Sequence, residues 1–145
     1  MKIYYPVIFY QDETGKFIGI VPDLQGCLTQ GRDLTHAMYW IQDAIGTWLD
    51  DPNEKDFPQP SKVSDIDTSE YPNAIVNIIE FDFEEWKSSL NNPIRHALYN
   101  SGMPARQLAK IMGAPYRTIK NYDEGKVKPP EWIQKLIVEK IENSI

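Results

Sequence analysis

A C-terminal run of polar and basic side chains, residues 116–126, has the spacing expected of a surface that reads a nucleic acid. Ile119 and Tyr122 are three residues apart and would face a core if the run is helical, which leaves the opposite face to polar and basic groups. Such a face fits the DNA major groove, where side chains hydrogen-bond base edges while flanking cations contact phosphates. The predicted DNA-contacting residues are Arg106, Tyr116, Arg117, Thr118, Lys120, Asn121, Lys126 and Lys128.

The charges are divided unevenly along the chain. Residues 1–90 hold six basic and sixteen acidic side chains, a net charge of −10, whereas residues 91–145 hold nine and five, a net charge of +4. A length of 145 residues allows one ordinary domain or two small ones. The asymmetry predicts two domains, at 1–90 and 91–145, whose partners have opposite charges.

A cluster of carboxylates raises the possibility of a metal-dependent nuclease. Glu80, Asp82 and Glu84 alternate along a predicted strand and, with Glu85, could hold Mg²⁺. A two-metal nuclease, however, needs carboxylates that converge from separate elements, and the first predicted strand offers none. We interpret the cluster as edge charges that discourage aggregation. We therefore expect no enzyme activity, no catalytic residue, no metal site and no cofactor.

The other reactive side chains also argue against catalysis. Cys27 is the only cysteine, which excludes an intramolecular disulfide and a cysteine-based zinc site, and it has no adjacent histidine. His36 and His96 are predicted on the surfaces of separate helices. No apolar stretch approaches the roughly 20 residues that span a bilayer, so we expect a cytoplasmic protein without a membrane partner.

The acidic part is predicted to form a small, mainly antiparallel sheet with one helix. Strand-forming runs at 2–10 and 16–21 flank a polar loop that ends in a glycine, the pattern of a hairpin. Pro6 predicts that the first strand is at an edge or bulged. Further predicted elements are a strand within 24–31, a helix from Asp33 or Thr35 to about residue 50, an extended connection at 51–73 packed over the sheet, and a strand at 74–83 whose start is buried on both faces.

The basic part is predicted to be all helical. Asn92 precedes Pro93, the sequence of an N-cap followed by a proline in the first turn, and glycines end the successive helical runs. The runs after the first helix are 105–112, 116–124 and 131–142. The near absence of a loop between two of them is typical of a helix-turn-helix unit.

Residues 93–138 resemble the phage-repressor-like (XRE) helix-turn-helix family. The resemblance depends on QLAKIMG at 107–113, RTIKNYDEGK at 117–126 and the KPP that follows. Pro104, Pro115 and Ala105 stand where that family usually has helix-capping Ser or Thr and a glutamine that contacts phosphate. The alternative is a helical bundle that only packs against the N-terminal domain.

Residues 3–90 resemble the HicB antitoxin family of HicAB toxin–antitoxin systems. The resemblance implies an α+β fold in which a partial ribonuclease-H-like domain without nuclease activity precedes an all-α helix-turn-helix domain. It also implies a HicA-like toxin, a small basic ribonuclease with a double-stranded-RNA-binding fold, as the partner, and autorepression through double-stranded operator DNA. The matching residues are Tyr5-Pro6-Val7, Gly15-Lys16-Phe17, the PDLQGC run at 22–27, Thr29-Gln30-Gly31 and the helix beginning near Thr35.

An acidic domain would be attracted to the positive surface that a ribonuclease presents to RNA. Asp12, Glu13 and Asp23, near the hairpin loop and the glycine-rich turn, are therefore predicted toxin contacts. We expect a homodimer or a higher homo-oligomer. The main alternative is a stand-alone transcriptional regulator whose N-terminal domain senses a ligand or oligomerises, and a metal-dependent nuclease is a third possibility.

Overall fold

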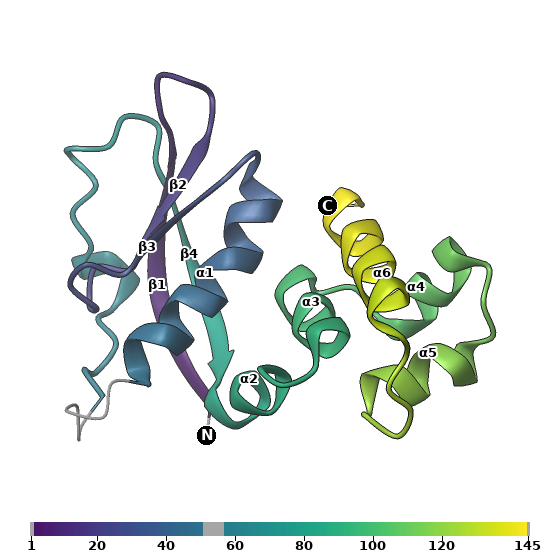
Figure 1. The fold of residues 1–145 in the computed structure, drawn as a ribbon. Helices are drawn as coiled ribbons and strands as arrows, with labels where there is room; N and C mark the ends of the chain where they lie inside the picture. The colour runs from purple at the N-terminus through teal and green to yellow at the C-terminus, as the bar shows by residue number, and fades with distance from the viewer. Residues whose placement is uncertain (1, 51–56, 145) are drawn as a thin grey trace. The chain divides into compact units, whose positions relative to one another are not determined.

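The computed structural model describes residues 2–50 and 57–144 (Figure 1). The chain divides into two compact units, Met1–Glu84 and Glu85–Ile145, which we call unit 1 and unit 2. Unit 1 contains a four-stranded antiparallel sheet and a long helix, and the described part of unit 2 is helical. The predicted α+β fold class is therefore confirmed.

The sheet of unit 1 has the strand order β3-β2-β1-β4, and every neighbouring pair is antiparallel. The first two strands form the predicted hairpin, in which Phe9 pairs with Gly19. Strand β4 pairs with β1 over eight positions of β1, from Lys2 to Phe9. The strands are β1 (Lys2–Gln11), β2 (Phe17–Ile20), β3 (Leu28–Gly31) and β4 (Ile75–Asp82).

The prediction that Pro6 marks an edge strand is wrong for β1 as a whole, because β1 lies between β2 and β4. Pro6 pairs with Ile78 of β4, but pairing with β2 begins only at Ile8. At Pro6 the strand therefore has one paired neighbour, and proline is accommodated without losing a bond to a second strand.

Helix α1 (Leu34–Leu49) covers one face of the sheet, which we call the helix face. Asp33 caps the helix by accepting a 2.8 Å hydrogen bond from the His36 backbone N–H. The approach of the helix is close, because a Cβ added at Gly31 would lie 2.5 Å from the Ala37 backbone nitrogen. The buried residues of α1 are Ala37, Ile41, Ile45, Gly46 and Leu49.

The described part of the predicted 51–73 connection begins at residue 57, and residues 51–56 lie outside the described residues. The connector, residues 57–74, contains a short 3₁₀ helix η1 (Val63–Asp65) and packs on the sheet, as predicted. The Tyr5 hydroxyl donates a 2.7 Å hydrogen bond to the Pro58 carbonyl. Further along, the Tyr71 ring lies 4.8 Å from the Tyr10 ring, centroid to centroid.

The prediction that the start of β4 is buried on both faces is wrong. Ile75 is 44% exposed and Ile78 is 59% exposed, whereas Ile79 and Phe81 later in the strand are buried. Ile75 and Ile78 point to opposite faces of the sheet, so neither face is fully covered at this end of β4.

Unit 2 is built from short helices around one apolar core, preceded by α2 (Phe83–Ser89), which begins at the end of β4. Asn92 caps α3 through its side-chain oxygen, with Pro93 in the first turn, and Gly102 ends α3 at φ 68°. The other helices are α3 (Pro93–Ser101), α4 (Ala105–Met112), α5 (Tyr116–Asp123) and α6 (Glu131–Asn143). The buried core consists of Ile94, Leu98, Met103, Leu108, Ala109, Ile119, Ile137 and Ile141.

Candidate nucleic-acid and protein interfaces

Helices α4 and α5 are joined by a tight turn at residues 113–115. Gly113 adopts φ 65°, a left-handed conformation that favours glycine, and its backbone N–H closes the end of α4. Pro115 then begins α5 with φ −61°, and its carbonyl accepts from the Thr118 N–H at 3.1 Å. Ile119 points into the core and is 2% exposed, which fixes the face that α5 turns outward.

The predicted DNA contacts lie on or beside that outward face, with different degrees of exposure. Arg117 is exposed, while Tyr116, Thr118, Lys120 and Asn121 are partly buried. Arg106, Lys126 and Lys128, which flank the helix, are exposed.

One of these residues connects the two helices at their N-terminal ends. The Arg106 guanidinium carbon of α4 lies 4.1 Å from the centroid of the Tyr116 ring on α5. This cation–π contact restricts the arginine side chain while leaving its N–H donors directed along the edge of the guanidinium plane.

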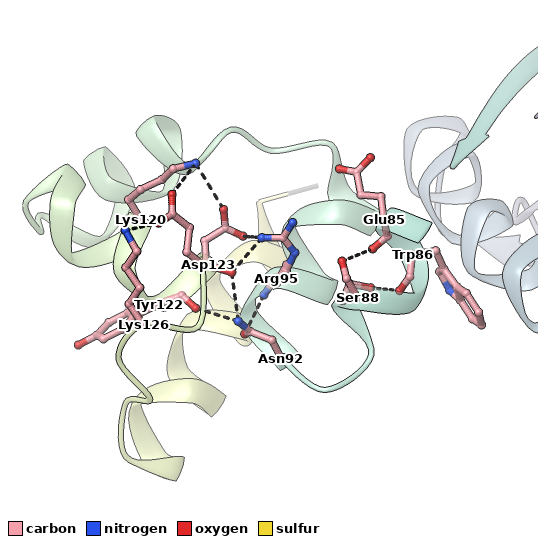
Figure 2. A network of polar contacts seen from close by, with 11 residues as sticks. Glu85, Trp86, Ser88, Asn92, Arg95, Lys120, Tyr122, Asp123 and Lys126 are labelled. Carbon is pink, nitrogen blue, oxygen red and sulfur yellow. Dashed lines mark hydrogen bonds and ion pairs between the residues drawn. The ribbon is translucent and has the colours of Figure 1, made fainter. Parts of the chain in front are cut away.

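The C-terminal end of α5 is tied to the start of α3 by a polar network (Figure 2). The Asn92 amide donates to the carbonyls of Tyr122 at 2.8 Å and of Asp123 at 3.2 Å. The Arg95 guanidinium donates to the Asp123 carbonyl at 3.2 Å and lies 3.8 Å from its carboxylate. These contacts set the direction of α5 relative to α3.

The same network engages two of the predicted DNA contacts. Lys120 Nζ lies 3.5 Å from a Glu124 carboxylate oxygen and 3.9 Å from an Asp123 oxygen, and Lys126 Nζ lies 2.9 Å from Glu124. The hydrogen bond from Lys126 is the main cause that lowers the pKa of the Glu124 carboxyl, with Lys120 adding to it. In the described part of the chain, no ion pair engages Arg117.

Sequence reasoning missed Asp123 and Glu124 as residues that modify this surface. The spacing of Lys120 and Glu124, four apart on one helix, is a signal that could have found half of the arrangement. The contact between Lys126 and Glu124 depends on how the chain turns after α5, where the Lys126 N–H donates to the Asn121 carbonyl at 3.0 Å.

The predicted toxin contacts do not form one cluster. Asp12 lies in the hairpin turn before β2, whereas Asp23 lies in the turn after β2, at the opposite end of that strand. Glu13, beside Asp12, is exposed.

Two of these three carboxylates have hydrogen-bond partners within unit 1. Asp12 accepts from the Thr14 hydroxyl at 2.6 Å, the Thr14 N–H at 2.9 Å and the Lys16 N–H at 3.0 Å, and the hydroxyl contributes most to lowering the pKa of Asp12. Asp23 accepts from the Ser61 N–H at 2.8 Å and from its hydroxyl. Both side chains therefore stabilise unit 1 itself, by shaping the hairpin turn and by holding the connector.

The residues considered for metal or nucleophilic chemistry lie apart from one another. Across residues 2–50 and 57–144, no three His, Cys, Asp or Glu side chains come together in a way that could hold a metal ion. Glu80 forms a 3.1 Å ion pair with Lys2. Cys27 is buried, and this burial raises the pKa of its thiol to about 11.

The histidines differ from the surface positions expected of them, because both are partly buried. His96 Nδ1 lies 2.9 Å from the Ser89 hydroxyl, and its Nε2 lies 3.2 Å from the Asn100 amide nitrogen. His36 accepts from the Arg32 N–H at 3.2 Å. As for membranes, the helices that the structure describes are all too short or too polar to cross one.

Comparison with known proteins identifies the class. Residues 5–112 match the sequence model of the "HicB_like antitoxin of bacterial toxin-antitoxin system". The chain is thus a protein of the antitoxin class, and an antitoxin role is supported. In particular, it belongs to the HicB-like antitoxin family.

The chain is also similar to individual proteins. UPF0150 protein Ta0767 of Thermoplasma acidophilum is 39% identical over 46 residues, which are 32% of this chain and 67% of that protein. A chain in the solved toxin–antitoxin complex from Streptococcus pneumoniae matches with a TM-score of 0.52 and 20% identity, covering 88% of this chain and 100% of that one. At this identity the match establishes a shared fold.

The family match and the predicted DNA surface overlap little. The match ends at Met112, the last residue of α4, so it includes Arg106 and excludes every predicted DNA contact on α5 and after it. The assignment of α4 and α5 as a DNA-reading unit therefore depends on their own geometry and charge.

Proposed function

We propose that this chain binds and inhibits a HicA-type ribonuclease toxin through residues 1–90 and binds operator DNA through residues 91–145 to repress its own operon. The observation that carries the proposal is the membership of the HicB-like antitoxin family, combined with the division of charge along the chain. No reaction is assigned to the chain itself.

The toxin-binding half is supported by charge. Residues 1–90 have a net charge of −10, and a ribonuclease that binds RNA presents a positive surface. Opposite potentials accelerate association and favour the matching partner over others. Asp12, Glu13 and Asp23 remain predicted contacts of this half.

The DNA-binding half is supported by the arrangement of α4 and α5. The outward face of α5 carries Arg117, Lys120 and Asn121, and the cation–π pair of Arg106 and Tyr116 lies at its N-terminal end. If the chain binds as a homodimer, its two-fold symmetry predicts a palindromic operator with half-sites ~34–36 Å apart or a multiple of that.

Two experiments test the two halves separately. Co-expression with the HicA-type toxin proposed as the partner should give a stable complex and should restore growth that the toxin arrests. Binding to the DNA upstream of the operon should weaken steeply with salt, with a slope of about −0.9 per phosphate contacted. A complex without growth protection would refute the inhibition, and affinity equal to that for unrelated DNA would refute operator recognition.

A further inference from the structure

Two large side chains on neighbouring strands of unit 1 are exposed to solvent. Tyr4 of β1 is 50% exposed and Ile78 of β4 is 59% exposed. The register pairs Tyr4 with Glu80 and Pro6 with Ile78, which places Tyr4 and Ile78 diagonally across neighbouring strands. Diagonal neighbours on one face are within reach of each other's side chains, so the pair forms one surface, which we call the Tyr4–Ile78 patch.

The patch lies on the face of the sheet away from α1. Gly19 and its partner Phe9 are on the helix face, because a Cβ at Gly19 would lie 2.9 Å from the Phe9 ring and 3.6 Å from Ile41 Cδ1 of α1. Side chains alternate along a strand, so Tyr4, five residues from Phe9, is on the other face.

Most of that other face is covered, so the patch is an uncovered area of limited extent. Ile8, on the same face of β1, is 3% exposed, and Pro6 is buried. Tyr10, at the far end of the strand, lies against Tyr71 of the connector. The cover therefore ends between Pro6 and Tyr4.

The charges on this side are mainly negative. The exposed Glu80 and the partly buried Asp82 share the second face of β4 with Ile78, and Lys2 alone opposes them there. Elsewhere in unit 1 the connector exposes three carboxylates, Asp65, Asp67 and Glu70, and one lysine, Lys62, so its exposed charge is also negative.

We propose that the Tyr4–Ile78 patch is the docking surface for a basic protein, the toxin of the proposed function, on which this inference rests. An exposed aromatic ring beside a branched aliphatic side chain, within a charged rim, is the composition of an interface centre. The acidic rim selects a basic partner. A second copy of unit 1 would instead bring two surfaces of the same negative sign together.

The patch also has a property that the predicted contacts Asp12 and Asp23 lack. Both carboxylates have intramolecular hydrogen bonds that they would lose or share on binding a partner. Tyr4 and Ile78 instead expose apolar surface that a partner can bury, and burial of such surface is the main favourable contribution to association.

The test uses the full chain and the purified HicA-type toxin of the proposed function, with affinity measured by calorimetry. The double variant Tyr4→Thr/Ile78→Thr places a residue of high strand propensity at both positions and should bind at least roughly 30-fold more weakly. Leu28→Thr is the control, because Leu28 is 58% exposed on the other outer strand, β3. It should bind within about twofold of the wild type.

Each result has a distinct meaning. If the double variant unfolds at the wild-type temperature and binds the toxin with wild-type affinity, the patch assignment is overturned, while toxin binding itself stands. The assignment is also overturned if Leu28→Thr loses as much toxin affinity as the double variant. A change in the oligomeric state of the double variant alone, with toxin affinity unchanged, would assign the patch to a second copy. Absence of binding by the wild-type chain would instead remove the proposed function.

Discussion

Glu124 and Lys126 form a 2.9 Å ion pair immediately after α5, and the same carboxylate lies 3.5 Å from Lys120 Nζ. Two cations predicted to face DNA therefore share an anion of their own unit. A phosphate that approaches them must compete with this carboxylate, so the positive surface is weaker here than the sequence suggests. Arg117 lies about one helical turn before Lys120, and among the described residues no carboxylate forms an ion pair with it.

Arg117→Ala should weaken binding to operator DNA by about 1–3 kcal/mol if the guanidinium contacts a base, because a good bidentate pair contributes that much discrimination. Fluorescence anisotropy with labelled operator measures the change. Lys135→Ala on α6, where Lys135 is exposed and pairs only with Glu131 among the described residues, is the matched control and should bind like the wild type. Equal affinities for Arg117→Ala and the control would exclude Arg117 from the interface.

Glu124→Gln should strengthen binding to unrelated DNA, because it frees Lys120 and Lys126 for phosphates while keeping the shape of the side chain. Each additional phosphate contact should steepen the dependence of log affinity on log salt by about 0.9. Titrations of wild type and variant at several salt concentrations measure this slope. An unchanged slope would show that neither lysine approaches the DNA backbone.

Asn92→Ala should destabilise unit 2 by about 1–3 kcal/mol, because it removes the N-cap of α3 and the amide that donates to the Tyr122 and Asp123 carbonyls at the end of α5. Urea unfolding followed by circular dichroism measures the loss. Asn91→Ala, one residue earlier and exposed, is the control and should unfold like the wild type. A variant Asn92→Ala of wild-type stability would contradict the anchoring role.

The Tyr5 hydroxyl should make the free energy of unfolding depend on pH in the alkaline range. Burial, followed by the nearby Asp23, raises the pKa of the Tyr5 hydroxyl from 10.0 to about 12. Between these values the unfolded chain loses a proton that the folded chain retains, so stability falls as pH rises from 10 to 12. In urea titrations, the stability difference between wild type and Tyr5→Phe should be constant below pH 10 and shift against the wild type above it. A difference that stays constant throughout would refute the raised pKa.

Local signals in the sequence predicted most helix ends and the hairpin. Asn92 is predicted as a cap, and Asp33 as one of two candidates with Thr35, from their types and positions; Asp33 and Asn92 both accept the expected backbone N–H bond. Glycine at 113 was assigned as a helix stop, and it has the positive φ that this role requires. These predictions succeed because a cap or a stop depends on residues within one turn of the helix.

What the sequence could not predict depends on contacts between distant residues. Ile78 is exposed because its face of the sheet is uncovered at that point, and an alternating apolar strand has the same sequence pattern whether or not a further layer packs on it. The hydrogen bonds of Asp23 come from Ser61, thirty-eight positions later in the chain. A carboxylate near a turn gave no indication of that partner.

Gly31 has a consequence for the whole of unit 1. A side chain there would meet the backbone of Ala37, so α1 could not stay where it is. The same helix brings Ile41 and Ile45 to the sheet, and both are completely buried. The end of β3 and the first turn of α1 thus fit together because position 31 has no side chain, and even alanine, the smallest replacement, would require one of them to shift.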